Sequence, residues 1–348
     1  MRSYPAYKAA AMHVSPIYLD TAKTVDKACS LIAEAARNGA RLVAFPEAYI
    51  PAFPLWATLR APGASNDFFR RLAANAVEVP GPEVQRIAQA ARDNDVFVSI
   101  GITEGTSASV GCLWNTNLLI GQDGRLLNHH RKIAPTYYEK LIWANGDGVG
   151  LNVVDTDLGR IGALICAENA NALARHAMMA QGEQVHIMNY PPGWIGRGSS
   201  VDKIIQSHAE VHCISAKVFC IVSSAFLSDA DRDAIADGDM KIRAMMDGIE
   251  RPKSMILAPS AEPCSPLLCE EEGIAYGNID LADCVVPKQF LDFTGNVSRF
   301  DIFKLTVDRS ANAAVVFEDE RRVRNHVGSD LTVVAEFKGV HHPPRLNA

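Results

Sequence analysis

Three residues whose side chains could together carry out nucleophilic catalysis follow short apolar segments of the sequence. Glu47 ends the segment LVAFPE, Lys132 comes after two histidines and an arginine, and Cys166 ends the segment ALIC. A carboxylate can act as a general base, a thiol as a nucleophile, and an ammonium group as a stabiliser of developing negative charge. Because ligands bind beyond the carboxyl ends of the strands in open α/β sheets, we expect these three side chains to converge there.

Cys166 lies where the sequence changes from a strand pattern to a helix pattern. The β-branched and small apolar residues before it predict a buried strand, and the small and polar residues 167–171 predict a helix start. A thiol at such a junction faces unpaired N–H groups and the positive end of a helix dipole, which predicts a stabilised thiolate. Taken alone, Cys166 is more readily interpreted as a buried structural cysteine, because free cysteine is among the most buried residue types.

Glu47 and Lys132 also have simpler interpretations when each is taken alone. Glu47 could be a solvated carboxylate at a helix start, and Lys132 could be one surface charge in a basic cluster. The three residues share a context at the ends of apolar segments, and this shared context favours a single reactive site.

The elements that must position these residues alternate along nearly the whole chain. Asp20 and Gly39 mark the two ends of a first amphipathic helix. Further helices are predicted over 82–92, 170–182 and 199–216, and strands over 8–14, 40–47, 96–103, 115–120, 151–155, 160–166, 185–190, 218–224, 254–259 and 274–281. This alternation predicts a single α/β domain with covered sheets over residues 1–312. Residues 313–348 lose the pattern and are predicted to be a tail, either an oligomer arm or disordered.

Composition narrows the class of protein. Hydrophobic residues make up 48% of the 348 residues and charged residues 21%, which indicates a globular protein with ample core material. The net charge of −6 and the scattered basic residues argue against a nucleic-acid partner. No segment has the length or apolarity of a signal peptide or membrane span, and the eight cysteines lack a disulfide-scaffold spacing, so a cytoplasmic location is expected. Cys264 and Cys269 lack a zinc-knuckle spacing and are interpreted as structural.

Three segments of the chain resemble one enzyme family. The segments FPEAYIPAFPLW (45–56), HRKIAPTYYEKLIWANGDG (130–148) and GALICAEN (162–169) are similar to motifs of the nitrilase branch of the carbon–nitrogen hydrolase superfamily, in the same order. The resemblance continues through 173–194 and, more weakly, 292–301. It implies an α/β fold of the family's kind, a four-layer αββα sandwich.

The resemblance also implies roles for individual residues. It makes Cys166 the nucleophile, Glu47 the general base and Lys132 the stabiliser of a tetrahedral intermediate, and it places Glu139 in the position of a second glutamate. Glu139 could orient Lys132 or help position Glu47 and the substrate; alternatively, it could be a solvent-facing partner of Lys140. The implied reaction converts a nitrile into a carboxylic acid and ammonia through a covalent thioimidate and a thioester.

The predicted substrate-binding residues include one departure from the family pattern. The family often has Trp directly after the nucleophile, where this chain has Ala167, which leaves a different wall beside the reacting carbon. The resemblance also places Tyr190 and Trp194 near the substrate pocket. A second departure is Asn296-Val297 in place of the family's His-Tyr, which would alter packing near the site or between subunits.

Several histidines offer weaker signals. His208 and His212 are four residues apart on a predicted helix, but Glu210 does not directly follow the first histidine as the zincin pattern requires, so structural or surface roles are favoured. His129 and His130 are interpreted as scaffold, since the family uses no histidine base. No metal or organic cofactor is implied, because thiol, base and cation complete the chemistry.

Other functions remain as alternatives at this stage. An amidase or carbamoylase of the same superfamily, or a hydratase-type activity that stops at the amide, would use the same residues, although TYYEKLIWANGDG favours the nitrilase branch. A catalytically inactive binding module on the same fold is a further possibility. A thiol-redox protein is disfavoured because Cys166 has no CxxC partner. The expected partners are a small nitrile substrate and further copies of the chain, as a dimer or a larger and sometimes spiral oligomer.

Overall fold

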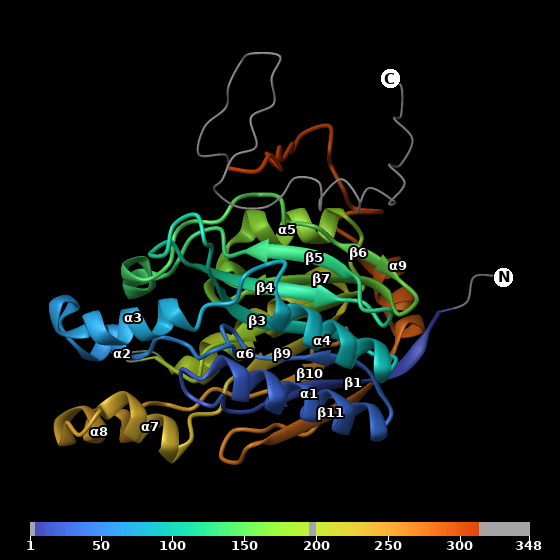
Figure 1. The fold of residues 1–348 in the computed structure, drawn as a ribbon. Coiled ribbons are helices and arrows are strands. Elements are labelled where there is room, and N and C mark those ends of the chain that lie inside the picture. Colours follow the sequence, from blue (N-terminus) through green and yellow to red (C-terminus); the bar gives the residue numbers. More distant parts are fainter. Residues whose placement is uncertain (1–3, 195–199, 313–348) are drawn as a thin grey trace, which may run out of the picture.

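A computed structural model describes residues 4–194 and 200–312, and its core is formed by two β-sheets packed face to face (Figure 1). The larger sheet has the strand order β11-β1-β2-β3-β4-β5 and the smaller one β10-β9-β8-β7-β6. The strands of the larger sheet are β1 (Ala6–His13), β2 (Ala40–Ala44), β3 (Phe97–Glu104), β4 (Trp114–Ile120), β5 (Leu126–Arg131) and β11 (Gly273–Asp280). Those of the smaller sheet are β6 (Val154–Thr156), β7 (Gly159–Ile165), β8 (Val185–Tyr190), β9 (Phe219–Ser224) and β10 (Met255–Leu257).

Helices cover the outer face of each sheet. Helices α1 (Thr21–Arg37) and α4 (Pro82–Asp93) pack together on the larger sheet, through apolar residues such as Ile32 and Ile87. On the smaller sheet, α5 (Ala172–Ala180) and α6 (Val201–Ala216) contribute Met178 and Ile205 to its core. The Asp20 side chain caps α1 by accepting a hydrogen bond from a backbone N–H, as predicted.

Strand alternation explains why both faces of each sheet are buried. In β1, Ala10 and Met12 pack toward α1 and α4, whereas Ala9 and Ala11 pack in the layer between the two sheets. Successive side chains of a strand point to opposite faces, so a strand that is apolar on both faces contributes side chains to two hydrophobic cores. The order of layers is therefore helices, sheet, sheet, helices, which confirms the predicted four-layer αββα sandwich.

The strand directions bring the chemistry-bearing residues to one end of the sandwich. Strands β1, β2 and β3 run parallel, and two antiparallel steps through β4 return β5 to the same direction. The carboxyl ends of β2 and β5 therefore face the same edge. Between the sheets, the Asn117 side chain donates to Asn189 (2.9 Å), which in turn donates to the Phe45 carbonyl (2.5 Å), so this edge is also held together across the two sheets.

Four helices outside the sandwich were not predicted. Helices α2 (Trp56–Leu59), α3 (Asn66–Ala74), α7 (Asp229–Ala236) and α8 (Met240–Asp247) lie at one end of the molecule (Figure 1). They share an apolar cluster that includes Trp56, Phe68, Leu72, Ile235, Ile242 and Met246. A further short helix, α9 (Val285–Phe290), follows β11.

Most predicted strands and helices are confirmed within a few residues, but two expectations are wrong and one strand was missed. The segment 151–155 is not a strand throughout, because Leu151 and Val153 pack beside α5 and only β6 pairs with β7. Strand β5 was not predicted, since its sequence LLNHHR is largely polar and half-buried at the sheet edge. Cys166 begins a five-residue 3₁₀ turn, Cys166–Ala170, and α5 starts only at Ala172.

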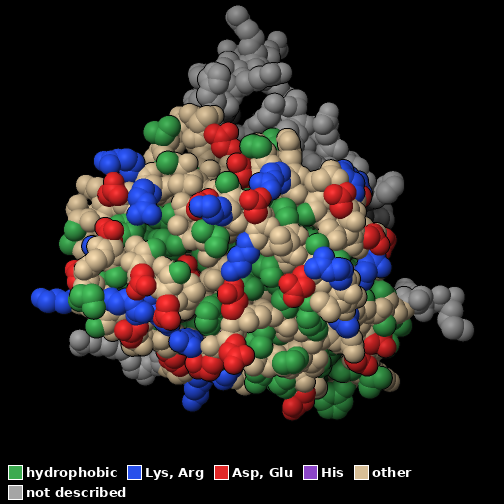
Figure 2. All heavy atoms as spheres, turned by 60° about the horizontal axis from the view of Figure 1, so that its bottom comes forward, with side chains coloured by type: hydrophobic (Ala, Val, Ile, Leu, Met, Phe, Trp, Pro, Cys, Tyr) green, Lys and Arg blue, Asp and Glu red, His purple; other side chains and the backbone are tan. Residues whose placement is uncertain are grey.

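The remaining sequence expectations concern the charges on the surface, membrane-spanning helices, the cysteines and the tail. On the face shown in Figure 2, basic and acidic side chains are interspersed. Within residues 4–194 and 200–312, no helix has the length and apolarity needed to cross a bilayer. All eight cysteines lie in the described residues and are unpaired, Cys264 and Cys269 included. The predicted tail, 313–348, lies outside the described residues.

Gly101 on β3 allows the backbone around Glu47 to lie directly against the strand. A Cβ at this position would lie 2.5 Å from the backbone nitrogen of Ala48 and closer still to the carbonyl oxygen of Pro46. We expect Gly101→Ala to lower the free energy of unfolding by about 1–3 kcal/mol, as overpacking does. Gly63→Ala is the matched control, since no atom lies within 4 Å of its Cβ position. Equal melting temperatures for the two variants in thermal denaturation would contradict this account.

Candidate active site

Glu47 is held in a tight turn that follows β2. The next residue, Ala48, has a positive φ of 45°, and the Glu47 N–H donates to the carbonyl of Tyr190 at the end of β8 (3.3 Å). The carboxylate is buried, with 1% of the residue exposed. Its Oε1 atom accepts hydrogen bonds from Asn115 Nδ2 and Lys132 Nζ, both at 2.7 Å. The interpretation of Glu47 as a solvated carboxylate is therefore wrong.

Lys132 follows β5 and is almost completely buried, at 1% exposure. Its backbone N–H donates to the Asn115 carbonyl (2.7 Å), and its carbonyl accepts from the Gly146 N–H (2.8 Å). The ammonium group donates to Glu47 Oε1 and to Glu139 Oε2, each at 2.7 Å. Lys132 is therefore a shared cation between two carboxylates and not a surface charge.

Glu139 lies in a short 3₁₀ turn, Tyr137–Leu141, and is 4% exposed. Its Oε2 atom accepts from the Thr136 N–H (2.8 Å) as part of a capping box and also from Lys132. The capping box fixes the carboxylate before it meets the ammonium group. Glu139 thus faces Lys132 and does not form the solvent-facing pair with Lys140.

Cys166 directly follows β7 and has a backbone conformation that is rare for residues other than glycine. Its φ is +51°, and the residue is 5% exposed. Left-handed backbone at a residue other than glycine costs free energy and occurs often at functional sites. The Cys166 sulfur lies within 4.8 Å of carboxylate oxygens of both Glu47 and Glu139. The predicted convergence of Glu47, Lys132 and Cys166 is confirmed, with Glu139 beside them.

The protonation of the site differs from the sequence-based expectation. Burial raises the pKa of the Cys166 thiol well above its usual value, and the nearby Glu47 carboxylate raises it further. The predicted stabilised thiolate is therefore wrong for this free state, because the sulfur meets a carboxylate and a short 3₁₀ turn and not the start of an α-helix. Burial opposes the charge of Lys132, but Glu47 and the other negative groups around it raise its pKa well above the usual range.

The pKa and the hydrogen bonds of Glu47 suit its carboxylate to accept and release a proton. Burial raises the pKa of Glu47 to about 7, Lys132 acts against this, and Glu139 adds to it. Its second oxygen, Oε2, is buried and has no hydrogen-bond partner among the described residues. A buried carboxylate with one oxygen committed and one free can accept a proton from a neighbouring thiol or water.

Glu168 connects the backbone beside Lys132 to the backbone beside Cys166. Its carboxylate accepts from the N–H groups of Ile133 and Ile165, both at 2.7 Å, and pairs with His130 Nε2 at 2.8 Å. The sequence did not identify Glu168, although a carboxylate two residues after the nucleophile could have been a signal. His130 is a scaffold residue, as predicted.

A second buried network of hydrogen bonds contacts the backbone carbonyl of Cys166. Asn169 donates to the Cys166 carbonyl (3.0 Å) and pairs with His186 (2.9 Å), and Glu183 bridges His186 (2.8 Å) and His212 (2.6 Å). Although burial acts in the opposite direction, the two histidines lower the pKa of Glu183 to about 2, whereas burial lowers the pKa of His212 to about 4. Ligand atoms around a tetrahedral zinc lie about 3.3 Å apart, so these contacts fit hydrogen bonds and not a metal site.

The predicted substrate-binding residues pack in the same apolar cluster as Cys166, whereas Asn296 and Val297 lie on an exposed segment. Ala167 and Trp194 are half-buried against one apolar cluster that contains Cys166 and Tyr190. Tyr190 is 1% exposed, and its hydroxyl has no partner among the described residues. The Asn296 side chain instead binds the backbone of residues 288–292 on an exposed segment, where Val297 is 42% exposed.

Comparison with known proteins agrees with this arrangement. Residues 8–288 match the sequence pattern of the family described as carbon-nitrogen hydrolase. The chain belongs to the carbon–nitrogen hydrolase family. It is 33% identical to a nitrilase of Bacillus sp. (strain OxB-1), over 100% of this chain and 98% of that protein. It is 34% identical to an aliphatic nitrilase of Rhodococcus rhodochrous, over 87% of this chain and 83% of the relative.

Solved structures support the fold of this carbon–nitrogen hydrolase. The crystal structure of a carbon–nitrogen hydrolase from Helicobacter pylori G27 superposes with a TM-score of 0.66 at 18% identity, covering 86% of this chain and 97% of the other. Family membership makes the protein a hydrolase that acts on carbon–nitrogen bonds.

We expect Glu168→Gln to weaken both the fold and the site, because the amide keeps only one accepting oxygen and its NH₂ group cannot accept, so either the Ile133 or the Ile165 N–H loses its partner. Loss of a buried, charge-assisted network lowers the free energy of unfolding by roughly 2–5 kcal/mol. Glu271→Gln is the control, because Glu271 is exposed. Urea denaturation measures both; a Glu168→Gln midpoint equal to that of Glu271→Gln would contradict the connecting role of Glu168.

Proposed function

We propose that this carbon–nitrogen hydrolase is a nitrilase that converts organic nitriles into carboxylic acids and ammonia. The observation that carries the proposal is the buried contact of Glu47 and Glu139 with one Lys132 ammonium, beside the Cys166 thiol. The relatives named nitrilase match nearly the full length of the chain and support the choice of substrate class.

In the first step, the Cys166 sulfur forms a bond to the nitrile carbon. Its proton passes to Oε2 of Glu47, which has no other partner among the described residues. One C–N π bond opens, and the nitrogen takes the proton from Glu47, which gives a covalent thioimidate and restores the carboxylate. Burial that keeps the thiol protonated is compatible with this step, because attack and proton transfer occur together.

In the second step, Glu47 takes a proton from water, and the oxygen adds to the thioimidate carbon. The resulting tetrahedral intermediate loses the C–N bond, and the protonated nitrogen leaves as ammonia, which gives a thioester. A second water then releases the acid and the free thiol in the same way. If the C–S bond breaks first, the product is an amide.

Lys132 serves this sequence of steps as a fixed hydrogen-bond donor. Its ammonium group is positioned by Glu47 and Glu139 before the substrate binds, so little reorganisation is needed when negative charge develops in the transition state. In this proposal Glu139 is a positioning residue that acts through Lys132, and Ala167, Tyr190 and Trp194 line the substrate side.

Ammonia release from aliphatic, arylaliphatic and aromatic nitriles tests the proposed function. We expect turnover of at least one class, with acid in excess of amide, and a loss of roughly 10⁴-fold or more in Cys166→Ala. Cys29→Ala is the control, since Cys29 lies on α1 away from the site. Turnover of amides but of no nitrile would replace this proposal with an amidase, and amide as the main product would indicate a hydratase-type activity.

The pH dependence tests the role of Glu47 as the base. Since the carboxylate must be ionised and its pKa is raised to about 7, kcat/KM should fall on the acidic side at a higher pH than an ordinary glutamate would give. The negative charge of Glu139 contributes to this raised pKa, so Glu139→Gln should move the acidic limb to lower pH. Lys140→Gln is the control, because Lys140 is exposed. A limb that stays in place or moves upward in Glu139→Gln would exclude Glu47 as the base.

We also propose that the enzyme works as a homo-oligomer in the cytoplasm, with residues 1–312 as its catalytic domain. Large apolar side chains are exposed near the end of the described chain: Val286 at 71%, Phe290 at 87% and Phe303 at 74%. Exposed apolar surface of this kind is typical of interfaces. Eight unpaired cysteines fit a reducing compartment. A mass of 37.7 kDa in light scattering, that of a single chain, would contradict assembly. Cell fractionation tests the location.

A further inference from the structure

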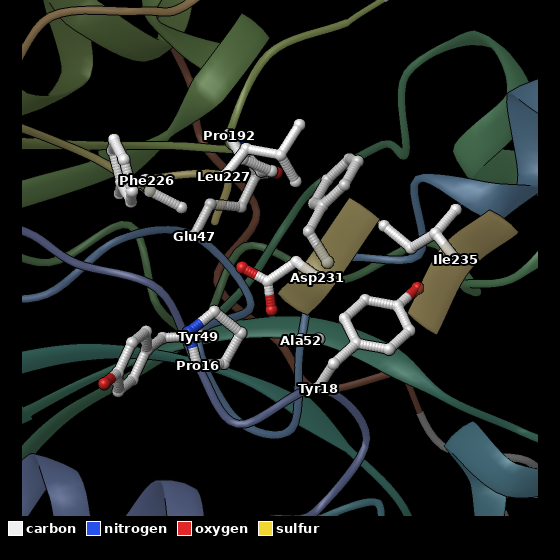
Figure 3. A pocket seen from close by; sticks show the side chains of 12 residues that line it. Pro16, Tyr18, Glu47, Tyr49, Ala52, Pro192, Phe226, Leu227, Asp231 and Ile235 are labelled. Atoms are coloured by element: carbon white, nitrogen blue, oxygen red, sulfur yellow. The ribbon is translucent and has the colours of Figure 1, made fainter. Parts of the chain in front are cut away.

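A pocket that opens beside Glu47 contains a second carboxylate, that of Asp231 (Figure 3). Figure 3 shows the Asp231 side chain pointing into the space between Glu47 and Tyr18. The lining is otherwise largely apolar and includes Phe53 and Leu227. The pocket therefore joins the proposed base to a buried acidic group from a different part of the chain.

Only one of the two carboxylate oxygens of Asp231 accepts hydrogen bonds from the described residues. It lies in the first turn of α7, and Oδ2 accepts from the Ser228 N–H (2.9 Å) and hydroxyl (2.6 Å) in a capping box. Oδ1 accepts no hydrogen bond from the residues that the structure describes, although the residue is only 3% exposed. A capping carboxylate on a surface helix has no need of such burial, so the free oxygen requires another explanation.

The charges of the two carboxylates in the pocket are balanced differently. Glu47 shares the Lys132 ammonium group at 2.7 Å, whereas Asp231 forms no ion pair within the described residues. The described lining contains no lysine, arginine or histidine. The buried hydroxyl of Tyr18, in the same lining, also lacks a partner there. The pocket thus presents a carboxylate that has no ion-pair partner among the described residues, together with aromatic rings.

We infer that the pocket recognises nitriles that carry a protonated amino group, which donates to Asp231 Oδ1 while the cyano carbon lies at Cys166. This inference rests on the proposed function and names its substrate class. An ammonium group would supply the counter-charge that Asp231 lacks and could also interact with the rings of Tyr18 and Phe53. A carboxylate on the substrate would meet like charge in a buried setting and would be rejected.

Pairs of nitriles of equal length that differ in their terminal group test the inference. The probes are aminoalkyl nitriles with three to six carbons and their methyl-terminated counterparts, for example 4-aminobutyronitrile against valeronitrile. At the best length, the amine should exceed its counterpart in kcat/KM by roughly tenfold to hundredfold, as expected for a charge-assisted hydrogen bond. 3-Cyanopropanoate should be the poorest substrate. Parity or a disadvantage of the amine at every length would overturn the inference, as would a preference for 4-hydroxybutyronitrile over the amine.

Two variants locate the selectivity. In Asp231→Asn, the ratio of the two kcat/KM values should fall toward one. Ser228→Ala weakens the same capping box but keeps the Ser228 N–H bond to Asp231, so its ratio should stay that of the wild type. A ratio retained in Asp231→Asn, or lost equally in both variants, would overturn the inference. The wild-type ratio decides the matter by itself if Asp231→Asn does not fold.

A binding measurement distinguishes a failure of this inference from a failure of the proposed function. Turnover of alkyl nitriles without an amine preference would leave the proposed function intact and remove only the role of Asp231. If no nitrile is hydrolysed, the proposed function fails, and calorimetry of 4-aminobutyronitrile with Cys166→Ala still tests the pocket. Binding that weakens at least roughly tenfold when Asp231→Asn is added supports the role of Asp231. Absent or unchanged binding overturns it.

Discussion

The buried Lys132 ammonium group, shared by two carboxylates, is the interaction on which the site depends. Charges removed from water are stable only when they are paired and hydrogen-bonded. Glu47 and Glu139 each lie 2.7 Å from the ammonium nitrogen, and Asn115 and the Thr136 N–H supply further donors to the two carboxylates. Burial raises the pKa of the adjacent Cys166 thiol, and the negative charge of Glu47 raises it further. The same electrostatics therefore stabilise the cluster and leave the thiol proton in place until a substrate arrives.

The αββα sandwich is what keeps this cluster in a dry and fixed place. Glu47, Lys132 and Cys166 each follow a different strand, so their geometry depends on how two sheets are joined. Asn117 and Asn189 connect the sheets at the same edge, and Glu168 joins the backbone beside Lys132 to that beside Cys166. Each of these polar groups is buried, so the loss of one partner leaves another unsatisfied. Rigidity at this edge thus follows from hydrogen-bond satisfaction as much as from apolar packing.

The sequence predicted the parts of the structure that depend on local patterns. Alternating strands and helices predicted a single α/β domain with covered sheets, whereas the family resemblance implied the four-layer sandwich. The ends of predicted strands pointed to Glu47 and Cys166, but the strand before Lys132 was not predicted. The sequence could not predict that Glu168 contacts His130 and Ile133, which lie 38 and 35 residues away, or that Asn169 contacts His186, which lies 17 residues away. The thiolate expectation failed because Cys166 begins a 3₁₀ turn instead of an α-helix, and because burial and the Glu47 carboxylate, which is distant in sequence, raise the pKa of the thiol.

The residues that react with the substrate and the residue that we infer recognises its amino group come from different parts of the chain. They lie together in the pocket beside Glu47. The reacting groups are supplied by the sandwich, whereas Asp231 belongs to α7, a helix outside it. One Asp231 oxygen caps the helix and the other faces the pocket, so the side chain contributes both to stability and to the charge of the pocket. Ser228 is the N-cap of α7 and Asp231 the N3 residue of its capping box, so a change of Asp231 removes one half of the box and the pocket carboxylate together, while Ser228 still caps the helix.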